Sequence, residues 1–492
     1  MQAQPETPLR ADVAVVGAGA AGLFAALVAA AEGAEVVLVS RSPLAETASY
    51  WAQGGIAAAL AEGDSPELHA RDTMAAGRRA ARESAVRVLC DESAARVRDL
   101  ERMGVSFDAD RFGNLALGLE GGHAARRIVH AGGSSTGRRV TRELSARAAT
   151  HERIHVLEPA AAVALWTEDR RCIGMVARRR DGAGIPVLAR SAVLATGGMA
   201  ALWIRTTNPP GAVGAGLTLA EAAGAQLADL EFMQFHPTAL HTGGRREGFL
   251  ITEAVRGEGA KLLNTDGERF VDELAPRDQV ALAIEAEMRA SDRPSVGLDL
   301  RGIDLARFPN IVSALAEVEI DPGTDLVPVA PAAHYTMGGV ATDLDGRSTL
   351  RGLYAIGETA CSGLHGANRL ASNSLAECFV YGRRAALAAA SEPAAPSTPP
   401  PLPEPGPPPL PPGDETRVAL WRDAGLQRDA EGLRRLAHDP FPLARLIAAA
   451  CLARTESRGA HQRTDHPQTD PGLDLMHTLV GGGSEPRFEH WG

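Results

Sequence analysis

The sequence is poor in cysteine and almost free of lysine. Its 492 residues include five cysteines, and no two of them form a Cys-x-x-Cys pair. This scarcity argues against a disulfide scaffold or a zinc ribbon and favours a reducing, cytoplasmic location. Lys261 is the one lysine among 50 basic residues, which we interpret mainly as codon bias toward arginine. The net charge of −11 makes non-specific binding to nucleic acid or to an anionic membrane unfavourable.

Long hydrophobic runs are also absent, with one apparent exception. Residues 13–31 are nearly all apolar, but Gly17, Gly19 and Gly22 interrupt them, and no strongly basic segment precedes them. We therefore expect neither a signal peptide nor a membrane span. Apolar residues make up 45% and charged residues 23%, the balance of a soluble globular protein. The length suits roughly two to four domains.

The N-terminal residues 11–40 predict a strand, a glycine-rich turn, a helix and a second strand. In such a unit, the Gly-x-Gly-x-x-Gly pattern lets the backbone approach a pyrophosphate at the helix N-terminus. The acidic residue expected about 20 positions later is missing, and Ser40 and Arg41 stand there instead. Either a flavin or a nicotinamide dinucleotide is compatible with this pair. The turn residues expected to contact the dinucleotide are Gly17, Ala18, Gly19, Ala20, Ala21 and Gly22.

Two later strands favour a flavin. One ends in Thr196 and Gly197, and another ends in Glu358, whose carboxylate could reach a ribose or ribitol hydroxyl. Three strand ends with small residues would converge on one extended cofactor. A second Gly-x-Gly-x-x-Gly pattern is not present, which counts against the NADP-dependent reductase that Arg41 suggests.

Longer motifs follow in order along the chain: 51–57 (WAQGGIA), 120–123 (EGGH), 234–238 (QFHPT), 252–257 (TEAVRG), 275–278 (APRD), 334–339 (HYTMGG), 366–375 (GANRLASNSL) and 455–461 (TESRGAH). With these motifs, the chain resembles the L-aspartate oxidases, a family within the succinate dehydrogenase/fumarate reductase flavoprotein group. The resemblance covers nearly the whole chain apart from a Pro-rich segment.

This resemblance implies FAD-dependent oxidation of L-aspartate to iminoaspartate, with oxygen or fumarate as electron acceptor. In the family, iminoaspartate passes to quinolinate synthase on the way to NAD, so that enzyme is a candidate partner. The resemblance assigns proton transfer to Arg277. Because a free guanidinium is a poor base, Glu253 is our candidate for the carboxylate that relays the proton. Glu120 resembles the acid that faces the substrate ammonium.

The remaining site residues fall into two groups. The substrate carboxylates need donors, and those expected are His236, Thr252, His334 and Arg369. Beyond the strand ends and the glycine turn, the resemblance implies FAD contacts at Ala48, Ser49, Gln53, Gly54, Gly55, Ala161, Ala162, Asp229, Asn373, Ser374 and Leu375. We expect no metal site.

Two positions depart from related enzymes. No histidine lies between Arg41 and Gly55, where respiratory members attach FAD covalently, so the FAD is expected to be noncovalent. Met337 stands where related enzymes often carry a small or thiol residue. A soluble fumarate reductase or succinate-oxidising flavoprotein is the main alternative, and a binding scaffold without turnover is a further one.

The expected fold class is α/β, with a Rossmann-like FAD-binding domain, an inserted α+β capping domain and a C-terminal helical bundle. The C-terminal helices could stabilise the fold, shape the site entrance or bind a partner, and either a monomer or a homodimer fits. The predicted boundaries are 1–229 and 336–391 for the FAD-binding domain, 230–335 for the capping domain, 392–413 for a stiff Pro-rich linker and 414–492 for the C-terminal helical domain.

Overall fold

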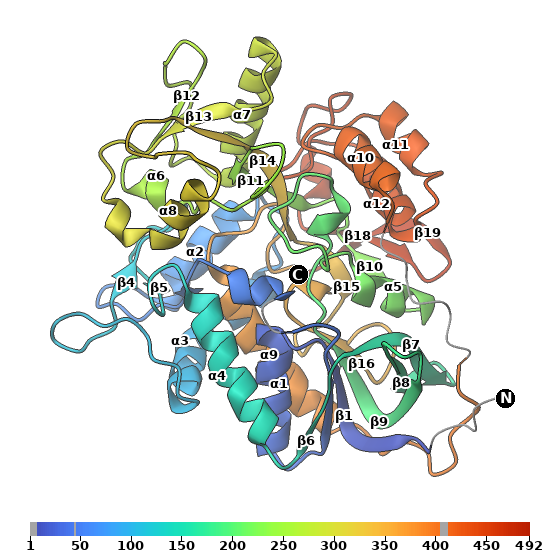
Figure 1. The fold of residues 1–492 in the computed structure, drawn as a ribbon. Coiled ribbons are helices and arrows are strands. Elements are labelled where there is room, and N and C mark those ends of the chain that lie inside the picture. The colour runs from blue at the N-terminus through green and yellow to red at the C-terminus, as the bar shows by residue number, and fades with distance from the viewer. Residues whose placement is uncertain (1–6, 44–45, 404–411) are drawn as a thin grey trace.

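A seven-stranded sheet forms the base of the molecule in the computed structural model, which describes residues 7–43, 46–403 and 412–492 (Figure 1). The strand order is β6-β2-β1-β9-β8-β7, with β16 also paired to β9. β6, β2, β1, β9 and β16 are parallel, whereas β8 is antiparallel to β7 and β9. The strands are β1 (Leu9–Val16), β2 (Val36–Val39), β6 (Ile154–Leu157), β7 (Ala160–Glu168), β8 (Arg171–Arg179), β9 (Gly184–Leu194) and β16 (Leu353–Ala355).

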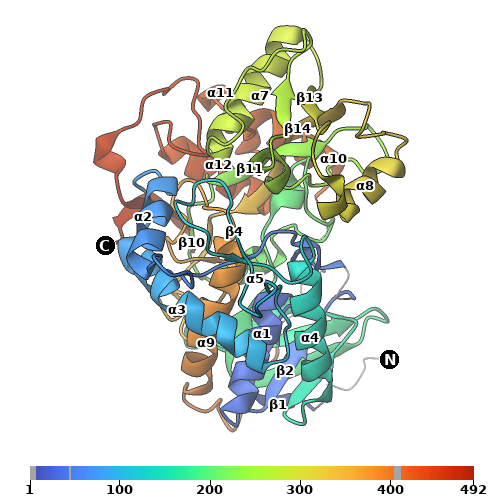
Figure 2. The same ribbon diagram turned by 90° about the vertical axis from the view of Figure 1, so that its left-hand side faces the viewer.

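The predicted N-terminal βαβ unit is present. Helix α1 (Ala20–Ala31) is buried over nearly its whole length, because its alanines let α9 (Asn373–Ala390) and α4 (Thr136–Thr150) pack closely. Phe24 and Phe379 meet edge to face, with ring centroids 5.2 Å apart. The layer is completed by α3 (Glu83–Arg102) and α2 (Pro66–Ala76), as Figure 2 shows from the side. This layer fixes the position of the glycine turn at the carboxyl end of β1.

A separate antiparallel sheet of four strands, ordered β11-β14-β13-β12, lies above the base. It has its own apolar core and occupies the stretch expected to form the capping domain (yellow-green in Figure 1). Its elements are β11 (Met233–Leu240), α6 (Ala254–Gly257), β12 (Lys261–Leu263), α7 (Arg277–Ser291), β13 (Val296–Asp299), α8 (Pro309–Ala316) and β14 (Val327–Thr336).

The C-terminal part contains strands as well as the predicted helices. Residues 414–492 were expected to form a helical domain, but within them β18 (Met476–Gly481) and β19 (Ser484–His490) form a hairpin. The hairpin extends a sheet ordered β17-β15-β10-β18-β19, whose other strands are β10 (Leu227–Ala228), β15 (Gly339–Ala341) and β17 (Ala360–Cys361). Helices α10 (Asp414–Asp423), α11 (Ala430–Leu436) and α12 (Pro442–Ala453) share an apolar core with the base sheet.

A buried ion-pair network attaches this C-terminal part. Arg454 lies between Glu231, at 2.7 Å, and Glu456, at 2.9 Å, and all three side chains are fully buried. Part of the predicted linker also contacts the base sheet, since Leu402 packs beside Trp166. Residues 404–411 of the predicted linker lie outside the described part of the chain.

Short elements complete the chain. Within the described ranges, no helix combines the length and the apolar composition needed to cross a membrane. The remaining elements are η2 (Ala48–Trp51), β3 (Ile56–Ala57), β4 (Leu117–Gly118), β5 (Ile128–Val129), η3 (Ala200–Leu202), α5 (Ala215–Ala222), η4 (Leu305–Arg307), η5 (Gly357–Thr359) and η6 (Pro471–Leu473).

Candidate active site

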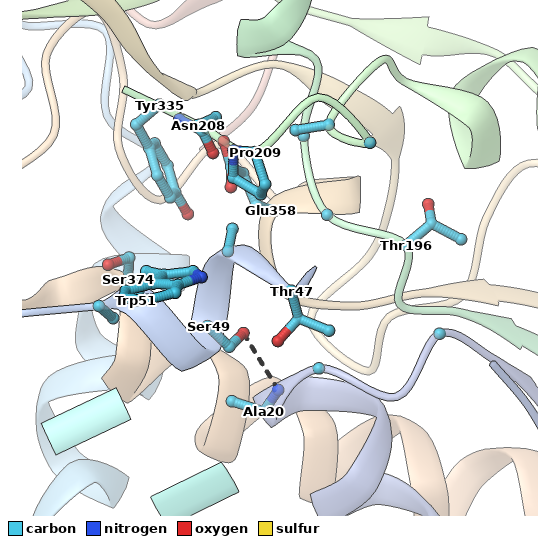
Figure 3. Close-up of a pocket in the computed structure, with 18 of the residues that line it drawn as sticks. Ala20, Thr47, Ser49, Trp51, Thr196, Asn208, Pro209, Tyr335, Glu358 and Ser374 are labelled. Atoms are coloured by element: carbon cyan, nitrogen blue, oxygen red, sulfur yellow. Dashed lines mark hydrogen bonds between the residues drawn. The ribbon is translucent and has the colours of Figure 1, made fainter. Parts of the chain in front are cut away.

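A cavity of about 630 Å³ lies between the base sheet and the capping sheet. Its floor is formed at the carboxyl ends of β1, β2 and β9, where ligands of open parallel sheets bind. Its other wall comes from β11, β14 and the start of α7. Figure 3 shows part of the lining, with Ser49 above Ala20 at the start of α1 and Glu358 farther up.

The glycine turn is required by close backbone contacts. Gly17 has a φ of 108°, and a Cβ there would stand 2.3 Å from the Ala195 carbonyl oxygen. A Cβ on Gly22 would stand 1.9 Å from the Gly17 carbonyl oxygen. Gly22 therefore packs the helix against the turn. The N-terminus of α1 then faces the cavity, and the Ala20 N–H donates to the Ser49 hydroxyl at 3.1 Å (Figure 3).

Most of the expected FAD contacts line this cavity, and three lie away from it. Gly22 packs inside the turn, as described above. The Asn373 side chain is buried and bonds His69 at 2.8 Å and Thr73 at 3.0 Å. The cavity-lining members are Gly17, Ala18, Gly19, Ala20, Ala21, Ser40, Arg41, Ala48, Ser49, Gln53, Gly54, Gly55, Ala161, Ala162, Thr196, Gly197, Glu358, Ser374 and Leu375.

Asp229 is the third residue away from the cavity. Its carboxylate is buried and lies 2.5 Å from His477 Nδ1, and it accepts the Thr478 N–H at 3.0 Å. Burial raises the pKa of Asp229, but His477 outweighs burial and lowers it overall. Asp229 therefore fastens the C-terminal hairpin to the end of β10, and it is not among the residues that line the cavity.

The polar groups at the base of the cavity fit FAD. Burial raises the pKa of Glu358 to about 7, so this carboxyl can donate to or accept from a ribityl hydroxyl near neutral pH. Gln53 Oε1 is buried without a hydrogen-bond partner among the described residues. A Cβ on Gly197 would meet no atom within 4 Å, so this turn leaves open space beside the sheet. An elongated cofactor with hydroxyls and a pyrophosphate suits these features.

The expected substrate residues meet at the capping end of the same cavity: Glu120, His236, Thr252, Glu253, Arg277, His334 and Arg369. Two of them are linked by a side chain that sequence reasoning missed. Gln234 Oε1 accepts from Arg277 Nη1 at 3.2 Å and from Arg369 Nε at 3.3 Å. The Arg369 guanidinium also lies 4.4 Å from the centroid of the Tyr335 ring. Sequence reasoning selected neither Gln234 nor Tyr335, although both belong to the motifs 234–238 and 334–339. Membership of these motifs was the signal that could have identified them.

The two histidines are neutral hydrogen-bonding groups. Their ring centroids are 5.1 Å apart. Burial, followed by the charge of Arg277, holds the pKa of both His236 and His334 well below the usual range. The Thr238 N–H donates to His236 Nδ1 at 3.2 Å, so the ring proton of His236 resides on Nε2. His236 can therefore donate from Nε2 while remaining uncharged.

Glu253 connects two arginines. Its Oε2 accepts from Arg277 Nε at 2.7 Å and lies 3.7 Å from Arg256 Nη2. Burial raises the pKa of Glu253, but the two arginines outweigh it and lower the pKa overall. Sequence reasoning did not select Arg256, although its i,i+3 spacing from Glu253 placed both on one face of a helical turn.

Glu120 is held beside this pair. The Ser372 hydroxyl donates to its Oε2 at 2.6 Å, and His130 Nε2 lies 3.8 Å from its Oε1. Burial raises the pKa of Glu120, but His130, Ser372 and Arg277 lower it to about 2. The site thus contains a carboxylate that stays charged, close to several cationic or neutral donors.

Fold and site together define a flavoprotein with its cofactor on a parallel sheet beneath a cap. Residues 12–375 match the family model of the FAD binding domain, and residues 431–490 match the fumarate reductase flavoprotein C-term model. The quinol fumarate reductase of E. coli has a similar structure, with a TM-score of 0.88 and 28% identity. That similarity covers 98% of this chain and 97% of the other.

Similar curated proteins identify the family within this class of flavoproteins. The L-aspartate oxidase of Caulobacter vibrioides is 46% identical, over 95% of this chain and 96% of the relative. The L-aspartate oxidase of Streptomyces coelicolor is 42% identical, over 97% and 92%. The chain belongs to the L-aspartate oxidase family, and FAD is its cofactor.

Proposed function

We propose that this protein oxidises L-aspartate to iminoaspartate with noncovalently bound FAD, the first step of NAD biosynthesis by way of quinolinate. One observation carries the proposal. Arg277, Arg369 and two neutral histidines line the same end of the cavity as the charged Glu120 carboxylate. This set offers donors for two carboxylates and an acceptor for one ammonium, the three charged groups of L-aspartate.

The substrate carboxylates bind to donors that the protein holds in place. Arg369 can bind one carboxylate through two parallel N–H groups, and its stacking on Tyr335 fixes the guanidinium plane. His236, His334 and Thr252 supply further donors at the same end. Because buried carboxylates are costly unless they are hydrogen-bonded, these donors also determine how the substrate lies. Orientation of C2 toward the cofactor accounts for much of the acceleration.

Proton transfer is assigned to the Arg277–Glu253 pair. When bound, FAD supplies the redox chemistry by accepting a hydride from C2 of the substrate. Arg277 alone cannot take up the amine proton, since its guanidinium is already protonated. Glu253, 2.7 Å from Arg277 Nε, can hold and relay a proton along the pair. Arg256 behind Glu253 extends the same line of charged groups.

The same cavity supports noncovalent attachment of FAD and a dicarboxylate as electron acceptor. Ala48 and Ser49 lie in η2 along the cavity, and residues 42–54 contain no histidine that could bond FAD covalently. Oxygen or fumarate then receives the electrons. Fumarate suits the carboxylate donors of the site because it is a dicarboxylate. Quinolinate synthase would consume the product, and either a monomer or a homodimer is compatible with this chemistry.

An anaerobic flavin spectrum tests this function. L-Aspartate should bleach the flavin band of the purified holoenzyme, and fumarate or air should restore the band. A soluble fumarate reductase or succinate-oxidising enzyme would use the same donors without needing Glu120. Bleaching by succinate and not by L-aspartate would therefore overturn the proposal in favour of that enzyme. Protein that stays colourless after FAD is added would exclude both activities.

A further inference from the structure

The loop between η3 and α5 contacts a substrate-binding histidine. Thr207 Oγ1 lies 2.8 Å from His334 Nδ1, and the Asn208 side-chain amide donates to the His334 carbonyl oxygen at 2.5 Å. Asn208 lies near Tyr335 in Figure 3. No sequence motif marked this loop, and the contacts span more than 120 residues of chain.

The surroundings of Thr207 define the direction of this hydrogen bond. Among the described residues, the other acceptor within reach of its hydroxyl is the Ala333 carbonyl oxygen, at a long 3.5 Å. That oxygen already accepts the Thr207 N–H at 3.0 Å and the Thr206 hydroxyl at 3.1 Å. Because a carbonyl oxygen has two lone pairs, both are in use. Among the described residues, His334 Nδ1 is therefore the acceptor left for a hydrogen bond from the Thr207 hydroxyl.

We propose that Thr207 is a positioning residue that fixes neutral His334 as the Nε2–H tautomer, aiming a donor at a substrate carboxylate. The proposal rests on the dicarboxylate substrate of the proposed function. His236 reaches the same tautomer through the backbone N–H of Thr238. Two independent contacts thus leave the ring proton on Nε2 in both imidazoles. A neutral histidine needs such a contact because either ring nitrogen can carry its proton.

The C-terminal part holds this loop in place. Arg417 of α10 donates from Nε to the Ala201 carbonyl oxygen at 3.1 Å, and its own carbonyl oxygen accepts the Ile204 N–H at 3.2 Å. The Arg205 guanidinium lies 5.1 Å from the centroid of the Trp421 ring. The position of Thr207 therefore depends on α10, which connects the C-terminal helices to the substrate site.

Three variants of the holoenzyme test the role of the hydroxyl: Thr207→Val, Thr207→Ala and Thr207→Ser. Succinate binding is followed by the change it causes in the flavin absorbance. Loss of one neutral hydrogen bond should raise the succinate Kd roughly three- to tenfold in the Val and Ala variants. The KM for L-aspartate should rise by a similar factor while kcat changes less. Thr207→Ser should restore wild-type values because it keeps the hydroxyl.

A double-mutant cycle separates tautomer control from a general effect on the loop. His334→Gln places an amide donor near the Nε2 position, and that donor has no tautomer to fix. Thr207→Val should therefore cost much less in the His334→Gln background than in the wild type. Equal costs in both backgrounds, or equal losses in the Val and Ser variants, would overturn the proposal. Wild-type affinity in the Val and Ala variants would overturn it as well.

The result is separable from that of the proposed function. Succinate binding can be measured whether or not L-aspartate is oxidised. A wild-type enzyme that binds succinate but fails to oxidise L-aspartate would contradict the proposed function alone. The Thr207 comparison would then still be decided by the succinate Kd values.

Discussion

Glu120→Gln separates recognition of the ammonium group from recognition of the carboxylates. The substitution keeps the size of the side chain and removes its charge. Ser372 donates to Oε2, and Oε1 lies 3.8 Å from His130 Nε2, so the carboxylate of this cavity-lining residue can still accept from a substrate ammonium. L-Aspartate has an ammonium group, whereas succinate and fumarate do not. We therefore expect a large loss of affinity for L-aspartate and no loss for the two dicarboxylates.

The size of the loss follows from burial. The Glu120 side chain is 9% exposed, so water screens its charge only weakly. A hydrogen bond to a charged partner contributes about 1.5–3 kcal/mol. At about 1.4 kcal/mol for each factor of ten, kcat/KM for L-aspartate should fall roughly ten- to hundredfold. The Kd for succinate should not rise, because the substitution removes a negative charge that repels this dianion.

Steady-state oxidation of L-aspartate and flavin-detected binding of succinate give both numbers on the same preparation. Ser372→Ala is the matched control, since it removes the hydrogen bond and leaves the charge, and it should produce a smaller loss. Similar losses for L-aspartate and succinate in Glu120→Gln would refute the ammonium contact and indicate a structural role.

The pH dependence gives a second check on the same residue. The pKa of Glu120 is lowered to about 2, so its carboxylate stays charged as the pH falls, until the pH approaches that value. The ratio of the affinities for L-aspartate and succinate should therefore be flat between about pH 8 and about pH 6.5, where both ligands keep their carboxylates ionised. A tenfold decline in this ratio over the same range would show that Glu120 titrates there and contradict the assignment.

Three further substitutions test the chemistry and the fold. Arg277→Leu should abolish turnover and retain the FAD spectrum; normal turnover would reject its role in proton transfer. Glu253→Gln should retain FAD and lower kcat more than it raises KM, because Arg277 keeps a partner but loses the proton acceptor; an unchanged kcat would remove Glu253 from the relay. Arg454→Met should lower the free energy of unfolding by about 3–5 kcal/mol in urea, since it leaves the buried Glu231 without its cation, whereas Glu456 keeps its pair with Arg458. The control is Arg87→Met, which removes an exposed ion pair with Glu83 and should change the unfolding midpoint little. Equal shifts in the two variants would show that the buried ion pairs of Arg454 contribute no more to stability than an exposed pair.

The sequence predicted best the features that short stretches determine. The run of apolar residues around Gly17, Gly19 and Gly22 defines a strand, a turn and a helix within about 30 positions, and the βαβ unit is present. The α/β class, the cap and the C-terminal helices also follow from ordered motifs along the chain. The seven substrate and catalytic residues line one cavity because each belongs to such a motif.

Features that depend on distant partners were missed. Asp229 was expected at the cofactor, but its partner His477 lies 248 positions later in a hairpin that no local pattern predicted. A buried carboxylate binds whichever donor the fold supplies, and the sequence around Asp229 does not reveal which one that is. Thr207 was missed for the same reason, since its contact with His334 forms across 127 positions.

The charge balance of the site shows what its neutral side chains accomplish. Arg277 comes from the cap and Arg369 from the loop before α9, and both donate to the side-chain amide oxygen, Oε1, of Gln234. A carboxylate at that position would pair with the guanidinium groups and compete with the substrate. The amide satisfies their N–H groups without cancelling their charge. Arg369 and the N–H groups of Arg277 that Glu253 does not bind therefore stay available to a dianionic ligand, and the neutral His236 and His334 add donors without further repulsion.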